Sequence, residues 1–68
     1  MIKKSVSIAG HRTSIALEIE FWDALKEILS KKGLSFSAFL VKIDEDRTTN
    51  LSSAIRVYIL KEFRNEVV

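Results

Sequence analysis

The chain has 68 residues, no cysteine and no proline, and it carries 11 basic and 9 acidic side chains for a formal net charge of +2. This length allows one small domain, residues 1–68, and the composition excludes disulfide cross-links and thiolate metal sites. A chain this short buries only about 60% of the surface that it exposes on unfolding, yet 47% of its residues are hydrophobic. We therefore expect a second copy of the chain to complete the core.

Charge and hydropathy patterns indicate a cytoplasmic protein with one positive end. The apolar stretches are only three or four residues long, too short to span a membrane. Lys3 and Lys4 are not followed by the apolar run of a secretory signal, and the lack of cysteine fits a reducing compartment. Residues 1–17 contain Lys3, Lys4 and Arg12 but no acid, so the positive charge gathers there.

Residues 11–17 have the alternation of a short strand with one buried face. Thr13, Ile15 and Leu17 fall on one face, and Arg12, Ser14 and Ala16 fall on the other. Residues 3–9 also alternate, but in the opposite phase, and Gly10 marks a turn or a bulge between the two segments. A hairpin and one bent strand are both compatible with this pattern.

Three helices are predicted after the strand, over about 19–32, 36–45 and 51–65. Gly33 is a natural terminator of the first helix, Ser35 offers an N-cap to the second, and Asn50 or Ser52 can cap the third. Apolar residues nearly encircle the third helix, so it is expected to be buried on several sides. The chain alone is too small to provide that cover, which again favours a partner chain.

A lone short strand is marginal unless another strand pairs with it. Pairing with its counterpart from a second chain would place Thr13, Ile15 and Leu17 over a shared dimer core. Arg12, Ser14 and Ala16 would then face outward in two copies related by a two-fold axis.

The segments Arg12–Leu17, Glu18–Leu25 and Gly33–Ala38 resemble ribbon-helix-helix proteins of the MetJ/Arc superfamily. Gly10–Ile15 and Asn50–Val57 are similar to segments of a group of short bacterial proteins with this domain. The resemblance implies a mostly α-helical, intertwined homodimer with an intermolecular two-stranded antiparallel ribbon that lies in the DNA major groove. The usual domain has two helices, so this chain is expected to have an extra one.

The resemblance also implies roles for individual residues. Arg12, Ser14 and Ala16 match the outward strand positions that contact bases. Phosphate is expected at the helix start after the turn, at Ser35 and Ser37, with Ser52 and Ser53 as the alternative if residues 34–49 are the extra helix. Lys3 and Lys4 would add phosphate contacts from the N-terminal arm.

The predicted function is therefore a dimeric DNA-binding protein, a transcriptional repressor or autoregulator. The alternative is a protein-interaction module, such as an antitoxin-like protein that binds a partner. No catalytic constellation is recognisable, so we do not expect an enzyme. His11 is the single histidine, and Asp44–Asp46 lacks the spacing of a calcium loop, so neither a metal nor a cofactor is expected.

Overall fold

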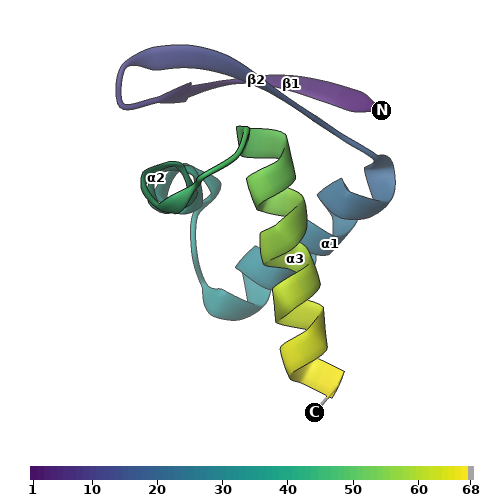
Figure 1. Cartoon of the computed structure of the whole chain (residues 1–68). Helices are drawn as coiled ribbons and strands as arrows, with labels where there is room; N and C mark the ends of the chain where they lie inside the picture. Colours follow the sequence, from purple (N-terminus) through teal and green to yellow (C-terminus); the bar gives the residue numbers. More distant parts are fainter. Residues whose placement is uncertain (68) are drawn as a thin grey trace.

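The computed structural model describes residues 1–67 and shows an N-terminal hairpin followed by three helices (Figure 1). The elements in chain order are β1 (Ile2–Ile8), β2 (His11–Leu17), α1 (Ile19–Lys32), α2 (Phe36–Asp46) and α3 (Leu51–Val67). The hairpin lies across one end of the helices, and α3 runs away from it toward the C-terminus. The predicted fold class, an N-terminal strand followed by helices of which one is additional, is confirmed.

The connection between the strands is a two-residue turn. Ala9 and Gly10 both have positive φ, +50° and +84°, as a type I′ turn requires. Ile8 pairs with His11 at the turn, and the antiparallel register continues to Ile2 opposite Leu17. This register puts the even-numbered apolar residues of β1 on the same face as the odd-numbered apolar residues of β2. The opposite phase of the two segments is therefore the signature of a hairpin.

The strand that pairs with β2 is thus β1 of the same chain. The sequence favours a counterpart strand from a second chain because a lone short strand is marginal, and it is compatible with either a hairpin or one bent strand over residues 3–17. In the hairpin, β1 pairs with the backbone groups along one edge of β2, so that edge needs no second chain. The intermolecular ribbon stays a prediction.

Local signals in the sequence set the helix ends. Gly33 ends α1 in the left-handed region at φ 64°, and its N–H and that of Leu34 bond back to the last turn of α1. Ser35 Oγ accepts the N–H of Ala38 at 3.1 Å, and Asn50 Oδ1 accepts the N–H of Ser53 at 2.9 Å. The helix α2 extends one residue and α3 two residues beyond the ends that the sequence predicted.

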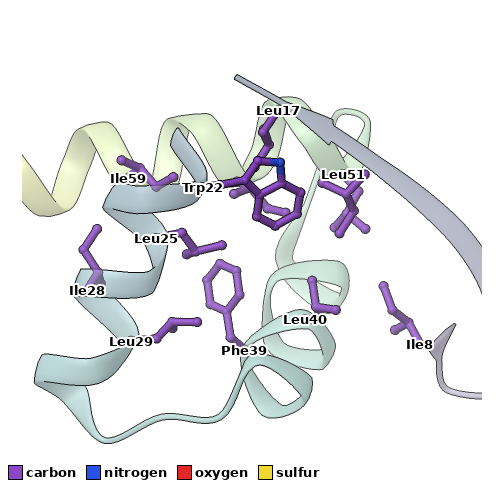
Figure 2. Close-up of a cluster of buried hydrophobic side chains, with 12 residues drawn as sticks. Ile8, Leu17, Trp22, Leu25, Ile28, Leu29, Phe39, Leu40, Leu51 and Ile59 are labelled. Carbon is purple, nitrogen blue, oxygen red and sulfur yellow. The ribbon is translucent and has the colours of Figure 1, made fainter. Parts of the chain in front are cut away.

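The core lies among the three helices and extends to the inner face of the hairpin (Figure 2). In this view Phe39 of α2 lies among Leu25, Leu29 and Leu40. Trp22, which the sequence places in the core, is 8% exposed and donates its indole N–H to the carbonyl of Ile2 at 2.9 Å. The buried residues, from every element, are Ile8, Ile15, Leu17, Trp22, Leu25, Ile28, Leu29, Phe39, Leu40, Leu51, Ile55 and Ile59.

Several apolar side chains of α1 and α3 remain exposed. Val57, Leu60 and Phe63 are 48%, 56% and 37% exposed, and they lie beside Phe21 and Ala24 along one shallow groove. The sequence predicts this exposure for a single chain, because apolar residues nearly encircle the third helix and one chain is too small to cover them all. None of the helices in residues 1–67 has both the length and the hydropathy needed to cross a bilayer.

Candidate nucleic-acid interface

The two faces of the hairpin differ sharply in character. The face toward the helices contains Ile8, Ile15 and Leu17, all buried. The residues paired on the opposite face are mostly polar, and all but the half-buried alanine are exposed; they are Lys3, Ser5, Ser7, Arg12, Ser14 and Ala16. We call these six residues the outer ribbon face.

The three predicted base-contact residues therefore share one exposed surface. Arg12 and Ser14 are exposed and Ala16 is half-buried. Of the three predicted dimer-core residues, Ile15 and Leu17 are fully buried within the single chain, whereas Thr13 is exposed on the same side near the turn.

The two N-terminal lysines lie on opposite faces of the hairpin. Lys3 pairs with Ala16 on the outer ribbon face, and with Arg12 it makes that face basic. Lys4 pairs with Ile15, and its Nζ lies 4.6 Å from the ring centroid of Trp22, within cation–π range. Adjacent residues of a strand point to opposite faces, and the pairing with β2 puts Lys3, not Lys4, on the outer ribbon face.

The first turns of α3 form hydrogen bonds with the edge of β2 that does not pair with β1. The N–H of Ala16 donates to Ser52 Oγ at 3.3 Å, and Arg56 Nη2 donates to the carbonyl of Ala16 at 3.4 Å. The N–H and the C=O of Ala16 both point to α3, so they do not bond to β1. In β2 the backbone hydrogen bonds to β1 are therefore made by the residues that alternate with Ala16. These contacts fix the N-terminus of α3 beside the ribbon.

Glu18 strengthens the same junction. Arg56 contacts its carboxylate through Nε and Nη2, each 3.1 Å from Oε1. A hydrogen bond from backbone N–H lowers the pKa of Glu18 most, and the hydrogen bond and the charge of Arg56 lower it further, while burial acts in the opposite direction. The carboxylate therefore stays ionised and paired at neutral pH.

A cleft of about 470 Å³ runs between the turn end of the ribbon and the start of α3. Its lining includes His11, two arginines, Arg12 and Arg47, and one acidic residue, Asp44. Asp44 Oδ1 lies 2.7 Å from Arg47 Nε, and the carbonyl of Thr49 accepts from its Nη1 at 2.9 Å. These two contacts hold the guanidinium in place at the cleft.

The first turn of α3 adds backbone donors to this cleft. Asn50 caps the helix, and its side chain and carbonyl accept the amides of Ser53 and Ala54. The preceding amides, of Leu51 and Ser52, have no acceptor within a helix. Both residues line the cleft, so their N–H groups and the helix dipole favour an anion there.

The residues predicted to contact phosphate lie at two different sites on the protein. Ser52 lies with Arg12 and Ser14 in the cleft beside the ribbon. Ser35 lies in a different cleft, with Trp22 and Phe36, and its hydroxyl is engaged in capping α2. Ser37 is exposed in the first turn of α2. The alternative pair, Ser52 and Ser53, begins a helix that packs against β2, and Ser52 bonds to Ala16 of that strand, whereas the helix that follows Ser35 packs against β1.

Sequence reasoning did not single out Ser5, Ser7 and Arg47. The two serines repeat the alternation of Lys3 along β1, a signal that was present but depended on pairing β1 with β2. Arg47 stood in a polar connector with no pattern to distinguish it. Among the residues that the structure describes, no three His, Cys, Asp or Glu side chains gather where they could hold a metal ion.

The structure thus combines an N-terminal two-stranded ribbon, polar on its outer face and apolar on its inner face, with three helices. The family model described as "Ribbon-helix-helix domain" matches residues 1–63, so the chain belongs to the ribbon-helix-helix family. Proteins of this family are generally DNA-binding transcription regulators or antitoxins, and they are typically not enzymes. No curated protein and no solved structure matches the chain significantly.

Proposed function

We propose that this protein is a homodimeric transcriptional repressor or autoregulator that applies its outer ribbon face to the major groove of DNA. The observation that carries the proposal is the placement of a basic, exposed ribbon face directly beside the capped N-terminus of α3. Family membership supports it, because ribbon-helix-helix domains typically form dimers and bind DNA.

Base contacts are assigned to Arg12, Ser14 and Ala16. The major groove is about 12 Å wide and admits a two-stranded ribbon. The Arg12 guanidinium can bond to guanine O6 and N7 together, the Ser14 hydroxyl can bond to several base edges, and the Ala16 methyl group can touch a thymine methyl.

Phosphate contacts are assigned to Lys3 and to the start of α3. The amides of Leu51 and Ser52 supply unpaired donors beside the ribbon, and Ser53 follows them in the same turn. We favour this helix start over Ser35 and Ser37 because Ser52 bonds to β2 itself. Lys4 is left out of the DNA interface because its ammonium lies over Trp22.

The dimer is proposed to form through the exposed apolar groove of α1 and α3. Val57, Leu60 and Phe63 line it together with Phe21, and its lining is almost entirely apolar. A mean hydropathy of +0.11 in a chain of 68 residues leaves apolar surface that a second copy would cover. A Leu60→Asp variant should be monomeric by light scattering, while an Arg64→Asp variant, changed at another exposed position of α3, should remain dimeric.

The second candidate function, an antitoxin-like protein, is favoured by the same apolar groove, which a different protein could occupy. The two functions differ in the behaviour of the purified chain. A protein that is monomeric at micromolar concentration and binds no DNA would favour a heterologous partner over the repressor.

The test of DNA reading begins with a pool of random duplexes, from which the purified protein selects its preferred site at physiological salt. Arg12→Ala should then weaken binding to the selected site by about 1–3 kcal/mol, roughly 5- to 150-fold, with folding unchanged by circular dichroism. Arg64→Ala, a charge change far along α3, is the matched control and should leave affinity unchanged. Equal affinity of Arg12→Ala and wild-type protein would rule out base reading by the ribbon.

A further inference from the structure

A cleft of about 570 Å³ lies between β1, α1 and the turn that leads from α1 into α2, and Trp22 forms part of its wall. Its volume falls within the range of about 300–1,000 Å³ that is usual for small-molecule sites. The lining is mainly apolar and includes two aromatic rings, 6.1 Å apart between centroids; the apolar residues are Trp22, Leu25, Leu29, Leu34 and Phe36.

The charged groups of this cleft are all of one sign. Lys4 from β1 and Lys26 from α1 both line it, and no residue of its described lining is acidic. Ser30 and Ser35 add hydroxyl groups. Lys4 Nζ already lies against the face of Trp22, at the boundary between the apolar floor and solvent. An apolar floor with two ammonium groups complements a molecule that has an apolar body and one negative charge.

We propose that this cleft binds a small amphipathic carboxylate, such as a short- or medium-chain fatty acid. The alkyl chain would lie on Trp22, Leu25 and Leu29, and the carboxylate would pair with Lys4 and Lys26. A neutral molecule of the same shape would leave the ammonium groups without their counter-charge, and a cation would be repelled by them.

The site is independent of DNA binding, but it contacts the ribbon. Trp22 donates its indole N–H to Ile2, the first residue of β1, and Lys4 belongs to the same strand. A ligand in the cleft would therefore touch Lys4 and Trp22, two of the residues that link β1 to α1, without touching the outer ribbon face.

Trp22 is the only tryptophan in the sequence, so its fluorescence reports on this cleft directly. The purified wild-type chain is titrated with octanoate, with 1-octanol and with octyltrimethylammonium, below the concentrations at which they form micelles. Octanoate should change the Trp22 emission saturably, with at least fivefold higher affinity than 1-octanol, and the cation should not bind.

Two variants and one control locate the carboxylate. Lys4→Gln and Lys26→Gln should each weaken octanoate binding at least threefold while leaving 1-octanol unchanged. Lys3→Gln, next to Lys4 but on the outer ribbon face, should bind octanoate like the wild-type protein. Folding of each variant is checked by circular dichroism.

Three results would overturn the proposal. Equal affinity for octanoate and 1-octanol would mean an unspecific apolar surface. No saturable change would mean that no site exists. Octanoate binding that disappears as the protein concentration rises and the chain self-associates would mean that a second copy occupies the cleft.

Discussion

Replacing Trp22 with Phe tests how β1 is held to the helices. The indole N–H donates to the Ile2 carbonyl at 2.9 Å, Lys4 lies over the ring, and the ring is 8% exposed. Phenylalanine removes the hydrogen bond, part of the ring surface and some of the attraction to Lys4. β1 would then be attached mainly by its pairing with β2 and by Ile8.

The expected cost is a sizeable part of the total stability. The lost hydrogen bond is worth about 1 kcal/mol, the lost packing about 1 kcal/mol, and the weaker cation–π contact a few tenths of a kcal/mol. A chain of this length is stabilised by about 3–10 kcal/mol in all. A loss of about 2 kcal/mol should lower the melting temperature by roughly 10 °C.

Urea unfolding followed by circular dichroism at fixed protein concentration measures the loss, since dimerisation would make stability depend on concentration. Hydrogen exchange locates it: the amides of Lys4 and Val6, which bond across the hairpin, should exchange faster in the variant. Phe36→Leu is the control, because it removes the neighbouring ring but keeps the indole hydrogen bond. A loss below about 0.5 kcal/mol, within the range of an ordinary surface change, would refute this account of β1.

Three further predictions concern ionisation and capping. The pKa of Glu18 is lowered in the fold, so its carboxylate stabilises the fold above about pH 4.3 and loses that effect as the pH falls further. The difference in unfolding free energy between wild type and Glu18→Gln, measured by urea titration, should therefore shrink in acid. Burial, followed by the charge of Glu62, raises the pKa of Tyr58, so the neutral phenol is favoured in the fold. Wild-type protein should therefore lose more stability than Tyr58→Phe as the pH rises past about 10. Asn50→Ala should cost about 1 kcal/mol in urea unfolding, and Asn50→Asp should restore it, because only the latter can accept the N–H of Ser53.

The helices could be predicted well because local signals set their ends. Gly33 is at the left-handed position that ends α1, and the polar residues Ser35 and Asn50 accept amides of the following turns. The first strand could not be assigned with the same certainty. Its turn begins with Ala9 at φ +50°, where asparagine, aspartate or glycine is the usual signal of a hairpin.

Only the part of the candidate site that follows from strand alternation could be predicted from the sequence. Alternation along β2 placed Arg12 and Ser14 on one exposed face. Which of Lys3 and Lys4 shares the face of Arg12 depends on the pairing of β1 with β2, and the choice of helix start depends on which helix packs against β2. Neither could be read from local sequence. Ile15, predicted in a dimer core, is already fully buried within one chain, and the exposed Leu60 is the better probe of dimerisation.

The most direct test of the central claim is amide chemical-shift mapping of the protein with its selected DNA duplex. The account predicts the largest perturbations on the outer ribbon face, around Arg12 and Ser14, and at the start of α3, at Leu51 and Ser52. Perturbations concentrated instead at Val57–Phe63, with the ribbon unchanged, would contradict DNA recognition by the ribbon.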